Sequence, residues 1–175
     1  MWWHRPRASA LAALVTLGAT VGACGFHPLY RDSSDREASA ELAAVHISTI
    51  PDRNGQMLHN FLLDRVNPQG RPAEPRYVLD VKISETKANL GIIKDSSSTL
   101  AQIAQVAYYS VRDIKAGTVL QSGRSRSVSS YNVVQSNFAT LAAEKDARER
   151  TLRELAEDIA TKVAVFLSTR KDGGS

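Results

Sequence analysis

The sequence predicts an α+β fold in which two helices cover one face of a mostly antiparallel sheet of about four strands, in the order β-α-β-β-β-α. Three observations carry this prediction. Residues 77–84 alternate apolar and polar side chains, residues 99–133 hold two strand-like runs around a glycine-containing turn, and residues 138–166 repeat apolar side chains at helical spacing. Helices on one face of such a sheet form a two-layer sandwich, and they leave the other sheet face free for water or a partner.

The chain begins with a predicted secretory signal peptide, residues 1–23. A short arm carrying His4, Arg5 and Arg7 precedes a run of mostly Ala, Leu and Val over residues 8–21. This run is too short for a bilayer core of ~30 Å, which needs about 20 apolar residues, but it suits the apolar region of a signal peptide, which needs about 7–15. We therefore expect the segment to be removed from the mature protein.

Cys24 is the single cysteine of the chain and directly follows the small residues Gly22 and Ala23, with aliphatic Val21 before them. This order is typical of a lipoprotein signal, in which the cysteine thiol carries a diacylglycerol and the amine freed by cleavage accepts a further acyl chain. Two or more acyl chains anchor a protein stably, whereas one binds only marginally. We expect Cys24 to hold the protein on a membrane surface without spanning it, and we expect no other cofactor. The alternative is an ordinary signal peptide with an incidental cysteine.

After the signal peptide we expect a tether and one folded domain. Residues 24–40 comprise the lipidated N-terminus and a polar stretch without apolar periodicity, which is typical of a linker. The domain is predicted over residues 41–171, with a disordered tail at 172–175. Removing residues 1–23 from 175 leaves 152, enough to bury a sizeable core. With Cys24 lipidated no disulfide can form, so the core alone must hold the fold.

The first part of the domain is expected to form a strand, a helix and a second strand. Residues 41–50 are apolar and partly β-branched, which favours a strand. From residue 54 or 55 to 66, apolar side chains fall three and four positions apart, which predicts a helix with Asp52 or Asn54 as its N-cap. The alternation over residues 77–84 predicts a strand with one buried face and one wet face.

The second part is expected to form a hairpin followed by a long helix. Residues 99–114 read as a strand, although the Ala and Gln content of residues 101–107 also fits a helix. Residues 115–118 contain the glycine that a tight turn demands, and the polar residues 119–133, rich in Ser and Arg, read as the returning strand. The apolar stripe of the final helix comprises Phe138, Leu141, Leu152, Leu155, Ile159, Val163 and Phe166.

The residue content argues against an enzyme, a metal site and a nucleic-acid partner. The four histidines show no His-His or Cys-His spacing that fits a metal site. The serines at 96–98 have no identifiable base beside them, which favours a solvated turn over a nucleophile. The formal charge of +4 includes Arg5 and Arg7 of the signal peptide, so the mature part carries 20 basic against 18 acidic residues, or +2. We therefore expect a non-enzymatic protein with no metal.

One group of basic residues is a candidate anion site. Arg124 and Arg126 are two positions apart on a predicted strand, so their side chains leave the same face about 7 Å from each other. Guanidinium groups suit phosphates because their planar fork donates two parallel hydrogen bonds. Lys82 and Arg112 would join them if strand pairing brings the same faces together. The alternative is that all four are solvated charges on a water-facing side.

Two stretches carry a family resemblance. The run Cys24-Gly25-Phe26-His27-Pro28-Leu29-Tyr30 resembles the start of the lipopolysaccharide (LPS) assembly lipoproteins of the LptE family, as they occur in alphaproteobacteria. Residues 137–159 resemble the final helix of that family. Together with the length and the element order, the resemblance covers essentially the whole mature chain, and it implies the same α+β architecture.

The resemblance also implies a function. It implies an outer-membrane lipoprotein on the periplasmic side that plugs and helps assemble the LPS-translocating β-barrel, LptD, and takes part in LPS insertion into the outer leaflet. LPS would then be a cargo whose phosphates meet the basic residues. Gly25, rather than an Asp after the lipidated cysteine, agrees with an outer-membrane address in the family's sorting logic. The polar content of residues 95–137 suits the polar lumen of a barrel or simply water. A free-standing, lipid-anchored periplasmic ligand-binding module is the alternative.

Overall fold

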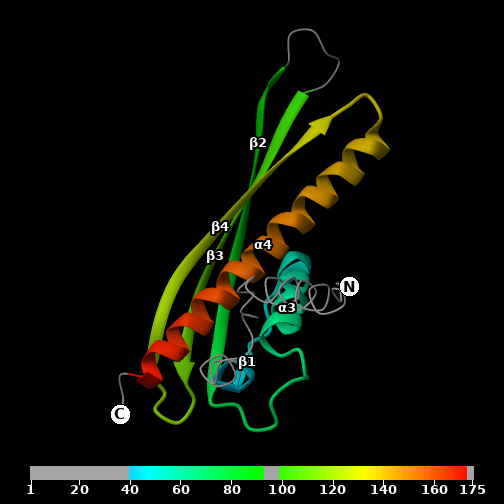
Figure 1. Ribbon diagram of the computed structural model, residues 1–175. Coiled ribbons are helices and arrows are strands. Elements are labelled where there is room, and N and C mark those ends of the chain that lie inside the picture. The colour runs from blue at the N-terminus through cyan, green and yellow to red at the C-terminus, as the bar shows by residue number, and fades with distance from the viewer. Residues whose placement is uncertain (1–39, 93–98, 173–175) are drawn as a thin grey trace, which may run out of the picture.

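The computed structural model describes residues 40–92 and 99–172. Its elements, in chain order, are β1 (Val45–Ile47), α3 (Asp52–Val66), β2 (Tyr77–Ile92), β3 (Thr99–Asp113), β4 (Val119–Val133) and α4 (Asn137–Asp172), as Figure 1 shows. The predicted α+β class and element order are therefore confirmed. The signal peptide, Cys24, most of the tether and residues 173–175 lie outside the described residues, so the domain boundaries stay predictions.

The sheet is a long antiparallel ribbon with one short strand added at its edge. Its strand order is β1-β2-β3-β4. β2, β3 and β4 are antiparallel neighbours of 15 or 16 residues each, whereas β1 has only 3 residues and lies parallel to β2, pairing Val45 with Tyr77 and Ile47 with Leu79. The ambiguous residues 101–107 belong to strand β3, where buried and half-buried side chains alternate.

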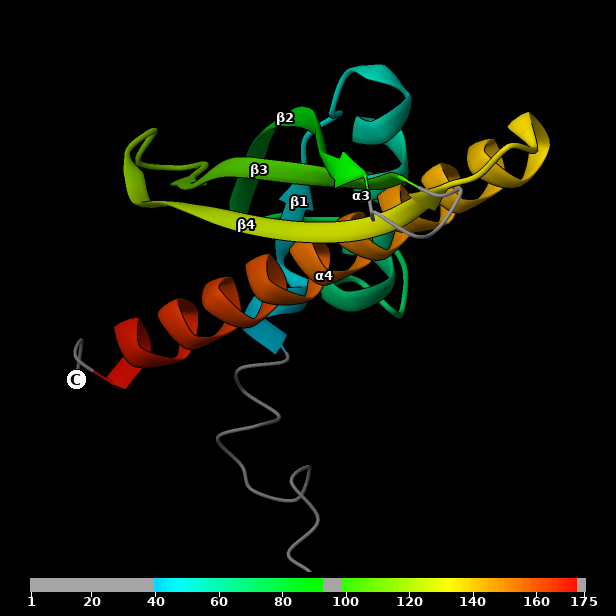
Figure 2. The same ribbon diagram turned by 90° about the horizontal axis from the view of Figure 1, so that it is seen from above.

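Both helices lie on the same face of this sheet. α4 runs along β3 and β4, and α3 packs beside α4 and contacts β1 and β2 (Figures 1 and 2). The stripe predicted for α3 is buried through Leu58, Leu62 and Val66, one helical turn apart from each other. The largest buried apolar side chains are Ile50, Leu58, Leu62, Leu79, Ile103, Leu152, Leu155 and Ile159. No described element covers the opposite face of the sheet, so the predicted two-layer arrangement with one free face is correct.

Three local expectations at the start of the domain need correction. The first strand is shorter than residues 41–50, because residues 40–43 are helical and only Val45–Ile47 pair with β2. β2 continues to Ile92, since pairing with β3 maintains it beyond the end of the apolar alternation. Neither Asp52 nor Asn54 caps α3, because Pro51 occupies the N-cap position without a side-chain hydrogen bond.

The first turns of α4 also differ from the prediction. The helix has 36 residues, but Phe138 and Leu141 of the predicted apolar stripe are 82% and 65% exposed. The stripe is buried only from Ala147 onward. Figure 1 shows that α4 begins beyond the end of α3, so α3 reaches only the border of these first turns and does not cover them. Helical spacing identified the apolar side of α4 correctly, but not how much of it is covered.

Leu155→Asp should strongly destabilise the domain. Leu155 is 1% exposed in the middle of the core, so the variant buries an unpaired carboxylate, and we expect the free energy of unfolding to fall by about 3 kcal/mol or more. Urea unfolding followed by circular dichroism measures this. Glu157→Ala is the control on the exposed side of the same helix, where we expect a loss within about 0.5 kcal/mol. A Leu155→Asp protein of normal stability would contradict the packing of α4.

Candidate functional site on the open face of the sheet

The open face of the sheet, which is the face turned away from α3 and α4, carries all four predicted basic residues, and three of them lie close together. The pairing register places Lys82 of β2, Tyr108 of β3 and Arg124 of β4 in one row across the sheet. The next row holds Ser84, Val106 and Arg126. Since neighbouring strands lie about 5 Å apart, Lys82 and Arg124 are separated by about 10 Å with the tyrosine between them. We call Lys82, Tyr108 and Arg124, together with Arg126 from the neighbouring row, the basic row.

The side chains of the basic row are accessible. Tyr108 is 55% exposed, which is high for a large aromatic side chain in the middle of a central strand. Lys82, Arg124 and Arg126 are exposed, and none of them forms a salt bridge within residues 40–92 and 99–172. A tyrosine ring between cations offers both an apolar surface and a hydroxyl group next to positive charge. These side chains could contact an anionic ligand that also presents non-polar surface.

Arg112 is not part of this group. It lies four residues along β3 from Tyr108, and its guanidinium pairs with the carboxylate of Asp80 on β2. The Asp80 carboxylate also accepts a hydrogen bond of 2.7 Å from the Ser48 hydroxyl. The positive charge of Arg112 is therefore already balanced. The structure brings Lys82, Arg124 and Arg126 together and leaves Arg112 in a separate ion pair.

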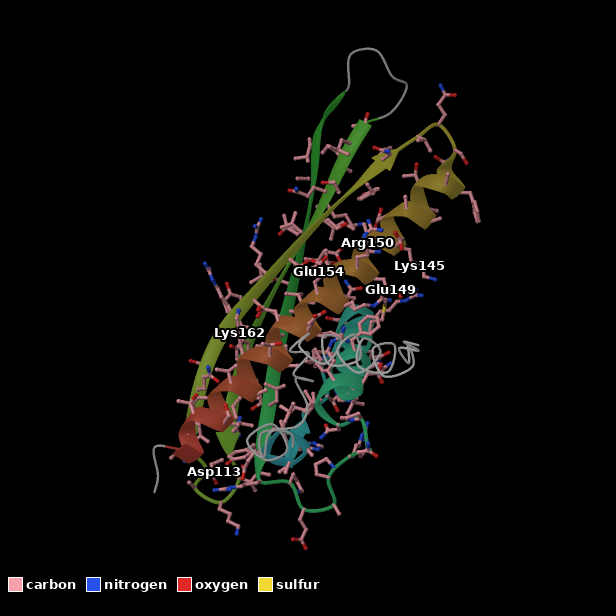
Figure 3. All side chains as sticks on the ribbon, viewed as in Figure 1. Asp113, Lys145, Glu149, Arg150, Glu154 and Lys162 are labelled. Atoms are coloured by element: carbon pink, nitrogen blue, oxygen red, sulfur yellow. The ribbon has the colours of Figure 1, made fainter. Side chains whose placement is uncertain are left out.

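The alternation of serine and arginine along β4 has a structural cause. Ser125, Ser127 and Ser129 point toward α4, so Arg124 and Arg126, at the alternate positions of the strand, point away. Lys162 Nζ lies 3.3 Å from Ser125 Oγ, and Ser127 donates a hydrogen bond of 2.5 Å to Glu154 (Figure 3). Small polar side chains let α4 approach the strand closely while its charged residues find partners. The contacts between α4 and β4 thus fix which side of the sheet carries Arg124 and Arg126.

A polar network on the helix side holds the ribbon to both helices, and sequence reasoning missed it. Glu85 of β2 accepts two hydrogen bonds from Arg148 of α4, of 2.9 and 3.1 Å. It also accepts bonds from Gln105 Nε2 at 2.8 Å and from Asn54 Nδ2 at 2.9 Å. Thr151 of α4 donates a hydrogen bond of 2.8 Å to Gln105 Oε1. Both the nitrogen and the oxygen of the fully buried Gln105 amide therefore have a hydrogen-bond partner. The sequence signal for this network was Glu85 itself, a charged residue at an inward-facing position of a strand.

Glu144 extends this network to the next turn of α4. It accepts a bond of 2.6 Å from Arg148, pairs with Lys87, and accepts a bond of 3.3 Å from the Tyr131 hydroxyl. Burial alone would raise the pKa of Glu85, but the hydrogen bonds from Arg148 and Gln105 outweigh it and hold that pKa below its ordinary value of 4.5. Hydrogen bonds from Lys87 and Arg148 lower the pKa of Glu144 as well. Both carboxylates therefore stay charged near neutral pH.

Within the described ranges no cluster of three or more His, Cys, Asp or Glu side chains is arranged to hold a metal ion. None of the helices in the described part of the chain has the length and apolar content needed to cross a membrane.

Arg148→Met should lower the free energy of unfolding by about 2–3 kcal/mol near neutral pH, because it leaves the largely buried Glu85 carboxylate without its bidentate partner. A carboxyl whose folded pKa lies below 4.5 stabilises the fold above about pH 4.5 and loses that contribution as the pH falls through its folded pKa. The difference between variant and wild type should therefore shrink in acid. Urea unfolding at about pH 7 and about pH 3.5 measures this.

Arg150→Met is the matched control for this prediction. Arg150 forms an ion pair with Asp146 on the same helix, but the two side chains are 44% and 65% exposed. We expect the free energy of unfolding to fall by about 1 kcal/mol or less. If Arg148→Met and Arg150→Met lowered it equally at both pH values, Arg148 would contribute no more to stability than an exposed arginine.

Comparisons with known proteins agree with this architecture. A protein of Rickettsia prowazekii (strain Madrid E), described as uncharacterized, is 24% identical over 153 residues, which cover 87% of this chain and 94% of the relative. A Caulobacter crescentus protein described as a lipoprotein has a similar fold, with a TM-score of 0.63 at 19% identity over 76% of this chain and 97% of that one. A minor lipoprotein of Acinetobacter baumannii gives a TM-score of 0.51 at 11% identity, over 69% and 91%.

The family assignment depends on the sequence of the folded domain. The family model LptE, described as lipopolysaccharide-assembly, matches residues 42–164. This match runs from the helical residues before β1 almost to the end of α4, and so includes every strand of the sheet. It confirms the family resemblance and includes residues 137–159, whereas residues 24–30 lie outside the matched range. The chain belongs to the LptE family of lipopolysaccharide-assembly proteins.

Proposed function

We propose that this protein is a non-enzymatic outer-membrane lipoprotein that plugs and helps assemble the LPS-translocating β-barrel, LptD, and takes part in LPS insertion into the outer leaflet. Membership of a lipopolysaccharide-assembly family supports the process. The signal at Val21–Cys24 supports the lipid anchor, and Gly25 supports the outer-membrane address on the periplasmic side.

The basic row is proposed as the part of the surface that meets the phosphates of LPS. The observation that carries this proposal is the pairing register, which puts Lys82, Arg124 and Arg126 on one exposed face without any ionic partner among the described residues. Arginine binds phosphate through two parallel hydrogen bonds, and lysine adds a point charge. Tyr108 offers a ring against which the non-polar face of a sugar can lie.

The open face also suits the proposed barrel partner. Apart from the basic row, it presents mainly small or polar side chains, such as Ser84, Ser110 and Ser122. Barrel lumens of this kind are polar, so such a face can contact them through hydrogen bonds and water. Both helices lie on the other side of the sheet, so no described helix blocks access of the barrel wall or LPS to the open face.

Arg124→Glu combined with Arg126→Glu should weaken binding of purified LPS to the detergent-solubilised full-length protein by about ten-fold or more, because two favourable contacts become repulsive. Raising the salt concentration should weaken wild-type binding as well. Since exposed charges contribute only about 0–1 kcal/mol to stability, the thermal midpoint should hardly change.

The control for this experiment is Arg71→Glu combined with Arg170→Glu. These residues are exposed, and the variant changes the net charge by the same amount away from the basic row. It should bind LPS nearly as well as the wild type. A folded Arg124/Arg126 double variant with unaltered LPS binding would remove the site assignment. An unfolded one would mean that the two arginines are structural.

Extraction of the envelope in a mild detergent should recover the full-length protein together with a large β-barrel. Recovery of the wild type as a lone monomer would instead favour a free-standing, lipid-anchored ligand-binding module.

Cys24→Ala should abolish lipidation, which intact-mass spectrometry detects as the loss of the acyl chains. An unlipidated wild-type protein would contradict the lipid anchor.

A further inference from the structure

A cleft of about 230 Å³ opens between the first turns of α3 and the N-terminal half of α4. It lies on the helix side of the molecule, away from the basic row. Its base is polar and already satisfied, because Asn54, Glu144 and Arg148 are engaged in the Glu85 network. What remains available to a ligand is therefore the wall and the rim of the cleft.

Two apolar side chains line the cleft, the half-buried Met57 of α3 and the exposed Leu141 of α4. Leu141 is 65% exposed, and Phe138, one turn earlier on the same helix, is 82% exposed. Single exposed apolar side chains are ordinary, but two large ones on one helical turn next to a cleft are typical of an interaction surface.

The rim of the cleft carries two cations without a partner. Arg53 and Lys145 line it, and neither forms an ion pair or a side-chain hydrogen bond with any residue of the described ranges. Figure 3 shows Lys145 and Glu149 on the side of α4 that borders α3.

The nearby carboxylates of α4 are already occupied. Glu144 pairs with Lys87 and Arg148, Asp146 pairs with Arg150, and Glu149 pairs with Arg153. The N-terminus of α3 adds partial positive charge, since no side chain caps it. Asp52, in the first turn of α3, is an acidic residue near this rim, but Arg53 and Lys145 together still leave an excess of positive charge there.

The size and chemistry of the cleft indicate its occupant. Pockets that enclose a whole small molecule have volumes of roughly 300–1,000 Å³, so this cleft fits one large side chain better than a complete ligand. Met, Arg and aromatic residues are enriched in protein interfaces, where one buried anchor contributes much of the affinity. Carboxylates beside that anchor would complement the charges of Arg53 and Lys145.

We propose that the cleft between α3 and α4 binds an acidic segment of a partner protein, which inserts one large apolar side chain between Met57 and Leu141 and places carboxylates against Arg53 and Lys145. This interaction goes beyond the function proposed above, because it uses the opposite side of the molecule from the basic row. The protein therefore has two separate binding surfaces that can be occupied at the same time.

Site-specific photo-cross-linking in intact envelopes tests the proposal. The photoreactive residue p-benzoyl-phenylalanine replaces Leu141 in the full-length protein, and in a matched variant it replaces Val165, which is 60% exposed on the same helix. We expect an adduct from position 141 to one partner protein and no such adduct from position 165. Mass spectrometry should place the cross-link in a segment with Asp or Glu beside a large apolar residue.

Several outcomes would overturn the proposal. These are the absence of an adduct at position 141, identical adducts from both positions, and adducts to lipid only. Cross-links to residues 24–39 of the same chain or to a second copy would mean that the protein covers its own cleft. A captured partner segment without acidic residues would also contradict it.

The charges at the rim provide a second, independent test. Arg53→Glu combined with Lys145→Glu should lower the yield of the adduct from position 141 by about ten-fold or more. Arg53→Lys with Lys145→Arg should preserve it, and Arg71→Glu with Arg170→Glu should leave it unchanged. If the charge reversal perturbs the thermal midpoint, Arg53→Gln with Lys145→Gln replaces it. Full cross-linking by a folded, charge-removed variant would rule out recognition of an acidic segment.

Discussion

The packing of α4 along β3 and β4 determines the arrangement of the whole domain. Side chains of a strand alternate between its two faces, so once a helix covers one face, every second residue must suit that contact. On β3 this selects apolar residues such as Ile103 and Val111, and on β4 it selects Ser125 and Ser127. The residues between them are then left on the open face. The position of Arg124 is thus a consequence of helix packing as much as of local sequence.

The Glu85–Arg148 pair connects the apolar core to the part of the ribbon that extends beyond it. Apolar contacts dominate near β1, whereas polar residues of β2 and β4 meet α4 farther along the sheet. A carboxylate placed there would be costly without partners, but hydrogen bonds from three elements satisfy it. This network joins α4 to a part of the ribbon that contributes few residues to the main apolar core. It also supplies the base of the cleft beside Leu141.

The two proposed binding surfaces follow from the two-layer architecture. A single sheet with both helices on one side has one face without helices and one face with a groove between helices. The face without helices carries the basic row around Tyr108, which we propose as the site for an anionic partner. The groove near Met57 and Leu141 suits a single anchoring side chain. If both proposals hold, the domain meets different components on opposite sides of one sheet.

The sequence by itself determined the elements, because apolar periodicity and turn residues act over a few neighbouring positions. It predicted β4 over residues 119–133, the buried stripe around Leu155 and the shared face of Arg124 and Arg126. It could not predict which charges would pair, because Arg112 and Asp80 meet only through the register of β2 and β3. Nor could it show that Phe138 stays exposed, since a helical stripe is buried only where another element reaches it. Those outcomes depend on contacts between residues far apart in the chain, which only the tertiary structure decides.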